Sequence, residues 1–89
     1  MKLIRVTAHS RVASVAGAIA GIIRDERGAE VQAIGAPAVN QMVKAVITAR
    51  RYLDADGIAT TCEPSFVDLD IDGEERTAIR FTIAKVGTA

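Results

Sequence analysis

A line of polar side chains in the middle of the chain has the chemistry to bind phosphate groups. At 100° per residue on a helix, Asn40, Lys44 and Arg51 fall within about 40° of one another. Lysine and arginine neutralise phosphate charge, and an asparagine amide can donate a hydrogen bond to a phosphate oxygen. Free backbone N–H groups at a helix start after Gly35 would add donors for an anion. An ordinary solvated helix face would show the same pattern, so the residues alone leave both interpretations open.

The distribution of charge along the chain is more informative than its sum. The 89 residues include 11 basic and 11 acidic side chains, so the net charge is zero, and the pI is near 6.6. This excludes a strongly basic nucleic-acid binder, for which a domain pI above about 9 is usual. Residues 1–24 and 31–53 nevertheless contain basic side chains and no acid, whereas residues 63–75 contain acids and no base. A neutral chain of this kind can present one basic and one acidic surface.

Residue types that serve enzymes and metal sites are scarce. The chain has one histidine, His9, and one cysteine, Cys62, which excludes a disulfide framework and a cysteine-based zinc site. The segment 17–21 lacks the lysine and the hydroxyl residue of a phosphate-binding P-loop. The aspartates at alternate positions from 68 to 72 are typical of a solvated sheet face. We therefore expect a protein that is not an enzyme and that has no metal site and no cofactor.

Membrane and export signals are also missing from the pattern. Arg11, Arg24 and Lys44 interrupt every candidate for the roughly 18 to 20 apolar residues that a membrane span requires. The first residues contain no apolar core of signal-peptide length. We expect a cytoplasmic protein without a membrane partner.

The period of the apolar residues predicts the order β-α-β-α-β-β. The expected elements are a strand over residues 3–8, a helix capped by Ser10 or Ser14 and ended by Gly28 in the left-handed conformation, a strand over 30–34, a helix with Pro37 at its first position, and two strands with apolar residues at 67–71 and 79–83. This order predicts an α+β fold, a two-layer sandwich in which two helices cover one face of a four-stranded mixed sheet. Without repeats or a linker, we expect a single domain over residues 1–89.

The two helices are expected to bury stripes of large aliphatic residues. The stripes are Val12, Val15, Ala16, Ile19, Ile22 and Ile23 on the first helix, and Val39, Met42, Val43, Val46, Ile47 and Leu53 on the second. Small residues lie on the other side of the first helix, at Ala13, Gly17, Ala20 and Gly21. Because glycine inside a helix costs about 1 kcal/mol relative to alanine, another backbone should approach there. That backbone belongs either to the second helix or to a partner subunit.

A hairpin is expected at Asp72-Gly73, a dipeptide that favours tight turns. The apolar residues on both flanking strands have odd numbers. Residues directly opposite each other in a hairpin face the same side, so if these apolar residues face one side, the residue numbers of each opposed pair must add up to an even number. A two-residue turn gives an odd sum. We therefore predict an odd number of loop residues or a bulge, and a three-residue loop with Gly73 in the left-handed position would satisfy this.

Four motifs together resemble one protein family over nearly the whole chain. The motifs are residues 15–21 (VAGAIAG), 32–36 (QAIGA), 40–46 (NQMVKAV) with Ala49-Arg50, and 70–79 (DIDGEERTAI). They closely resemble the stage V sporulation protein S family, which in turn looks like a bacterial branch of the Alba fold. Alba proteins are dimeric and bind chromatin and RNA. The resemblance thus implies a small cytoplasmic nucleic-acid-binding or regulatory protein, linked in endospore formers to late spore development.

The resemblance also implies where nucleic acid would bind. The implied surface combines the loop after the first strand (His9, Ser10, Arg11), the start of the second helix (Gly35, Asn40, Lys44) and the terminal hairpin. Two residues depart from the expected pattern: His9 stands where a lysine is expected, and Pro37 stands where a second glycine is expected. The hairpin is also acidic, unlike the basic arms of the Alba proteins. A histidine is mostly neutral at pH 7 and would make binding more sensitive to acid. We expect Arg76 to pair with Asp68 or Asp70 across the hairpin.

Three functions remain to be distinguished. The first is a homodimer, or a higher homo-oligomer, that binds DNA or RNA through phosphate contacts of Arg11, Lys44, Arg51 and Arg5, with modest, salt-dependent affinity and little sequence preference. The second is a protein-interaction or assembly module that does not bind nucleic acid, which the acidic hairpin favours. The third is an enzyme acting on a small anion at Gly35, which the scarcity of catalytic residues disfavours.

Overall fold

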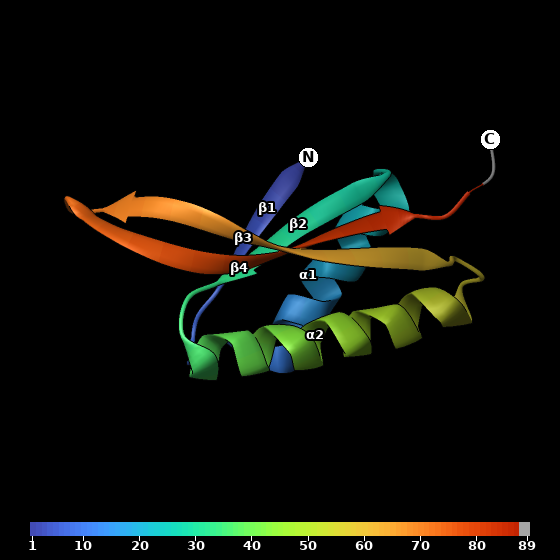
Figure 1. The fold of residues 1–89 in the computed structure, drawn as a ribbon. Coiled ribbons are helices and arrows are strands. Elements are labelled where there is room, and N and C mark those ends of the chain that lie inside the picture. The colour runs from blue at the N-terminus through green and yellow to red at the C-terminus, as the bar shows by residue number, and fades with distance from the viewer. Residues whose placement is uncertain (88–89) are drawn as a thin grey trace.

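Two helices pack against one face of a four-stranded mixed sheet (Figure 1). The computed structural model describes residues 1–87. The elements are β1 (Lys2–Val6), α1 (Val12–Asp25), β2 (Gly28–Ala33), α2 (Ala36–Ala55), β3 (Thr60–Ile71) and β4 (Glu74–Lys85). The strands lie in the order β1-β2-β4-β3, with β1 and β2 parallel and the other neighbours antiparallel. The α+β sandwich expected from the sequence is confirmed.

The core lies between the two helices and the strands β1, β2 and β4. Ile19 and Ile23 of α1 and Met42 and Leu53 of α2 are almost fully buried against strand residues such as Val31. Alanines fill the rest of the helix faces: Ala16, Ala20, Ala38, Ala45 and Ala49 are all buried. Small side chains allow the two helices and the sheet to approach closely, so the core is thin and densely packed.

The stripe predicted for α2 is partly wrong. Val43 and Ile47 are 36% and 52% exposed, although both were expected in the core. The core side of α2 carries Ala45 and Ala49 instead, because close packing against α1 and the sheet selects small residues there. Val43 and Ile47 consequently lie on a flank that no other element of the described chain fully covers.

Both predicted ends of α1 are also wrong. Neither Ser10 nor Ser14 caps the helix: the N-cap is Arg11, without a side-chain bond, and the Ser10 hydroxyl accepts from the Thr7 N–H at 2.9 Å. Gly28 is a buried residue of β2 and does not have a positive φ. An added Cβ there would lie 2.7 Å from the Ile83 carbonyl oxygen. Close approach of β4 therefore explains this glycine, and a helix stop does not.

The hairpin between β3 and β4 has a two-residue turn, so the predicted three-residue loop is wrong. Asp72 and Gly73 have φ values of 53° and 79°, the left-handed pair that a type I′ turn requires. Leu69 consequently pairs with Arg76, and Phe66 pairs with Ile79. Residues 67, 69 and 71 therefore face away from the side on which residues 79, 81 and 83 lie.

The hairpin extends beyond the rest of the sheet. β2 pairs with β4 only from Ile79 to Ala84, whereas β3 pairs with β4 as far as Glu74. Residues 67–78 thus form a two-stranded arm, which projects on the side of the molecule where α2 begins (Figure 1).

Candidate functional site

The structure brings together two of the regions that were expected to form the binding surface. The side-chain amide of Gln41 in α2 donates to the Ser10 carbonyl at 2.9 Å, although the two residues are 31 positions apart. This bond holds the loop after β1 against the first turns of α2. The predicted residues of the loop therefore share one end of the molecule with those of the helix start.

The loop after β1 is shaped by its own hydrogen bonds. The Ser10 N–H donates to the Thr7 carbonyl at 3.1 Å, and the His9 N–H donates to the Thr7 hydroxyl at 3.2 Å. Because the Ser10 hydroxyl accepts from the Thr7 N–H, it shapes the turn. The side chains of His9 and Arg11 are exposed and available to a ligand.

Gly35 sets the direction in which α2 starts. It is the N-cap residue, with φ 88°, a conformation that favours glycine, and no side chain caps the helix. Helix α2 begins at Ala36, so Pro37 is its second residue and not its first as expected. The Pro37 ring removes one N–H from the donors that this end offers to an anion.

Four cations of the expected surface are not held in ion pairs. Arg5, Arg11, Lys44 and Arg51 are exposed, and none lies within 4.0 Å of a carboxylate among residues 1–87. Arg50 differs, because it approaches Asp54 at 3.9 Å. Lys44 and Arg51 lie about 10 Å apart along the helix axis at 1.5 Å per residue. Asn40, on the same line, is also exposed.

The arm separates its acids from its apolar residues. Asp68 lies opposite Thr77, whose hydroxyl donates to it at 3.1 Å, and Asp70 accepts from the Gly73 N–H at 2.9 Å. Arg76 lies opposite Leu69, so its expected pairing with an aspartate is wrong. Since side chains alternate along a strand, Asp68 and Asp70 share one face of the arm, and Leu69 and Arg76 share the other.

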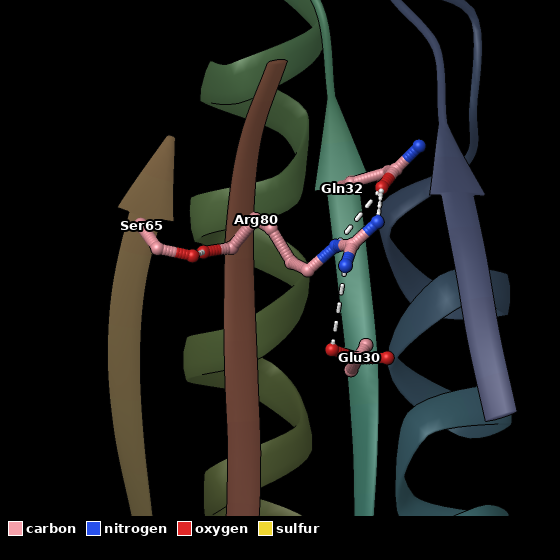
Figure 2. Close-up of polar contacts among 4 residues, drawn as sticks. All are labelled: Glu30, Gln32, Ser65 and Arg80. Carbon is pink, nitrogen blue, oxygen red and sulfur yellow. Dashed lines mark hydrogen bonds and ion pairs between the residues drawn. The ribbon is translucent and has the colours of Figure 1, made fainter. Parts of the chain in front are cut away.

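A polar cluster on the uncovered face of the sheet was not predicted (Figure 2). The Arg80 guanidinium donates twice to the Gln32 side-chain oxygen, at 3.1 and 2.7 Å, and lies 3.6 Å from the Glu30 carboxylate. Figure 2 shows these side chains on the side of the sheet away from the helices. The sequence signal is the pair of polar residues Glu30 and Gln32 at alternate positions of β2, which places both on one face of the strand. The partner of Gln32 became identifiable only once the register placed it opposite Arg80.

Replacing Arg80 with methionine should lower the free energy of unfolding by about 1–2 kcal/mol, because the Gln32 oxygen would lose both donors. Urea denaturation of the two proteins measures the difference. Arg76→Met is the matched control, since Arg76 is exposed on the same strand, and it should change stability by no more than about 0.5 kcal/mol. Equal effects of the two substitutions would contradict a structural role for the cluster.

An apolar groove of about 250 Å³ lies between α2 and the β3–β4 hairpin. Val43 and Ile47 line it from the helix, and Cys62 and Phe81 line it from the strands. Phe66, on the same face of β3 as Cys62, is 79% exposed. Partial burial raises the pKa of the Cys62 thiol, which keeps it protonated and weakly reactive near pH 7. The sequence did not reveal this flank.

The small residues of α1 differ in burial. Ala20 is fully buried in its own chain and Gly21 is partly buried, whereas Ala13 and Gly17 are exposed. An added Cβ at either glycine would meet nothing within 4 Å. Close packing inside the described chain therefore does not account for Gly17, and the expected subunit contact there stays a prediction.

Two kinds of feature are missing from residues 1–87. No group of three or more histidine, cysteine, aspartate or glutamate side chains there is arranged to hold a metal ion. No helix in the same range has the length and apolar character needed to cross a membrane.

Comparison with known proteins connects this geometry to a family. The family model of stage V sporulation protein S (SpoVS) matches residues 2–86. The chain belongs to the SpoVS family. Membership implies a sporulation-related role. Among solved structures, the chain is similar to Alba from Thermoplasma volcanium, with a TM-score of 0.64 at 13% sequence identity, over 92% of this chain and 98% of that one. This SpoVS-family chain therefore has an Alba-like fold.

Proposed function

We propose that this SpoVS-family protein is a homodimeric nucleic-acid-binding protein of regulatory or architectural type that acts in the cytoplasm. The observation that carries the proposal is a group of four cations without ion pairs among residues 1–87. Arg11 follows the loop that Gln41 joins to α2, Lys44 and Arg51 lie on α2, and Arg5 lies on the neighbouring strand β1. Cations that no carboxylate neutralises are free to displace counterions from phosphate. The Alba-like fold supports the same function, because the Alba proteins bind chromatin and RNA.

The mechanism is phosphate neutralisation without a chemical step. Arg11 and Lys44 contact the backbone of DNA or RNA, with Asn40 as a neutral donor, and Arg51 extends the contact along α2. With a few contacts per subunit, affinity is modest and falls steeply with salt. The chain's three aromatic residues, Tyr52, Phe66 and Phe81, are too few and too scattered to stack successive bases, so sequence preference is weak.

Lys44→Glu tests this function. At about 50 mM salt, the substitution should weaken binding of a fluorescent DNA or RNA by tenfold or more, and the salt dependence of the remaining binding should be shallower by about one counterion per site. Fluorescence anisotropy at about 50 and 200 mM salt measures both quantities.

Arg27→Glu is the matched control, because it makes the same change of charge beyond the other end of α1 at an exposed residue without an ion pair among residues 1–87. It should leave affinity within about twofold of the starting protein. Equal losses in Lys44→Glu and Arg27→Glu would contradict a localised phosphate surface.

An assembly module without nucleic-acid binding is the second candidate. The arm favours it, because it carries Asp68, Asp70, Asp72, Glu74 and Glu75 against one base, Arg76. These carboxylates repel phosphate and would suit a basic protein partner. Failure of both DNA and RNA to bind at about 50 mM salt would favour this function over the first.

The dimer contact we propose is the apolar flank formed by Val43, Ile47, Cys62, Phe66 and Phe81, with a second copy of the chain as its partner. These residues come from α2 and β3–β4, so a twofold axis through the flank would bring the same surface of each copy together. A chain of 89 residues buries only about 60% of its unfolded surface on folding, so it gains stability from such a contact.

A further inference from the structure

A second cavity, of about 310 Å³, lies where the parallel strands β1 and β2 end. The arm closes one side of it with Leu69 and Ile71, and the strand ends and the start of α2 supply Val6, Ala33 and Pro37. Its volume is at the lower end of the range of pockets that bind small organic groups, and its walls are mostly apolar.

One polar side chain in this cavity is fixed in place and has donors to spare. Gln32 lines the cavity and is 4% exposed. Because its oxygen accepts both bonds from Arg80, the orientation of the amide is set, and Figure 2 shows its nitrogen on the side away from Arg80 and toward β1. Within residues 1–87 this nitrogen has no hydrogen-bond partner, yet it is not sealed from solvent. It therefore offers N–H donors to a ligand.

The charges around the cavity suit an anionic ligand. Arg5 pairs in register with Gln32 and lines the cavity as an exposed cation. The arm directs Leu69, Ile71, Arg76 and Glu74 to one face, so that one base and one acid balance there, and it directs Asp68 and Asp70 to the other face. The apolar side of the arm thus faces the cavity, while these two carboxylates point away from it.

The cavity also adjoins the proposed phosphate surface. Thr7 and Ala8 line it immediately before His9, and Ile34 and Pro37 line it on either side of Gly35. A strand whose phosphates contact the first loop and α2 would pass over its mouth.

We propose that this cavity binds an unpaired nucleobase, an inference that rests on the proposed function. The apolar walls would contact the faces of the base, the Gln32 amide would donate to a carbonyl on its edge, and Arg5 would pair with the adjoining phosphate. A base inside a duplex is stacked and paired, so it cannot enter. The protein should therefore prefer single strands, whose bases are free to enter the cavity.

The test compares four ligands: an eight-nucleotide oligouridylate, an abasic strand of the same length, a duplex of the same length, and uridine monophosphate. Oligouridylate should bind about tenfold more tightly than the abasic strand, since burying one base contributes that much. In NMR spectra, oligouridylate and uridine monophosphate should shift the Gln32 side-chain amide, and the abasic strand and the duplex should not.

Ala8→Trp blocks the cavity from an exposed position that lines it, so the fold is expected to survive. This variant should bind oligouridylate no better than the abasic strand, with its abasic affinity unchanged. Ala18→Trp, the same substitution at an exposed position of α1 outside the cavity lining, should retain the tenfold difference.

The outcomes separate the two proposals. Equal affinity for oligouridylate and the abasic strand, or a Gln32 shift caused by the duplex, overturns the base pocket and leaves phosphate binding intact. If no strand binds but uridine monophosphate still shifts Gln32, the phosphate surface fails and the cavity is a site for free nucleotides. If neither strands nor the nucleotide act on the protein, both proposals are overturned.

Discussion

Replacing Gly28 with alanine is expected to lower the free energy of unfolding by about 2–3 kcal/mol. The new Cβ would lie 2.7 Å from the Ile83 carbonyl oxygen and 2.9 Å from the end of the Met1 side chain. Met1 can move aside, but the Ile83 oxygen belongs to the backbone of β4, which is paired with β2. Relief of the contact therefore requires the two central strands to separate locally. Urea denaturation at one fixed protein concentration measures the loss.

Gly17→Ala is the matched control for this prediction. Gly17 lies inside α1, and an added Cβ there would meet nothing within 4 Å. Alanine should therefore stabilise the protein by about 0.5–1 kcal/mol through its higher helix propensity. The same substitution is thus expected to have opposite signs at the two glycines. A neutral or stabilising effect at Gly28 would show that β2 and β4 are less closely packed than the structure has them.

Replacing Ile47 with glutamate is expected to convert the proposed dimer into a monomer. Ile47 is 52% exposed and lines the groove between α2 and the hairpin. In a symmetric contact, one substitution places two carboxylates in the same apolar interface. A central apolar residue of this kind contributes about 2 kcal/mol or more, so dimer affinity should fall about thirtyfold or more. Light scattering after size exclusion should show the mass fall from twice 9.4 kDa to the mass of one chain.

Tyr52→Glu and Gly17→Leu are the controls for the dimer contact. Tyr52 is 42% exposed on α2 but does not line the groove, so Tyr52→Glu should leave the mass unchanged. Gly17→Leu enlarges the small-residue face of α1, the other subunit contact that the sequence suggested. A mass reduced by Gly17→Leu and retained by Ile47→Glu would assign the contact to α1 and contradict the groove.

The order of the elements could be predicted from the sequence because their apolar residues have a clear period, whereas the ends of α1 were predicted wrongly. Alternation at β1 and β4 and the three-to-four spacing at α1 are local properties, so one chain is enough to show them. The predicted buried stripe of α2 was partly wrong, and the reason is not local to the helix. Ranking residues by size and hydrophobicity selects Val43 and Ile47 for the core, whereas the structure buries Ala45 and Ala49 between Met42 and Leu53. The width of the space between α2 and its neighbours is set by the tertiary fold.

The predicted register of the hairpin was wrong because it rested on an assumption about the core. Odd-numbered apolar residues on both strands were expected to face the same layer of helices. The arm extends past β2, so Leu69 and Ile71 have no helix layer to face, and they line the cavity at the strand ends instead. The local signal of Asp72-Gly73 favoured a two-residue turn from the start, and the structure agrees with that signal.

The candidate site was predictable in its cations and not in its cavity. Lys44 and Arg51 could be placed on one line from helix periodicity alone. The Gln32–Arg80 contact spans 48 residues, and the cavity beside it is formed by four separate segments, so neither leaves a pattern in a single stretch of sequence. What the sequence does show is two polar residues, Glu30 and Gln32, at alternate positions of β2.

A change in the length of the turn at Asp72-Gly73 would change which side chains of β3 line the cavity, and with them the ligand that the cavity suits. One residue inserted there would slip the pairing of β3 against β4 by one position and reverse the faces of β3. Asp68 and Asp70 would then replace Leu69 and Ile71 above the strand ends. An insertion at an exposed turn is among the best tolerated of changes. Relatives that differ only in the length of this turn are thus expected to sort into two groups, one with an apolar pocket and one with an acidic pocket suited to cations.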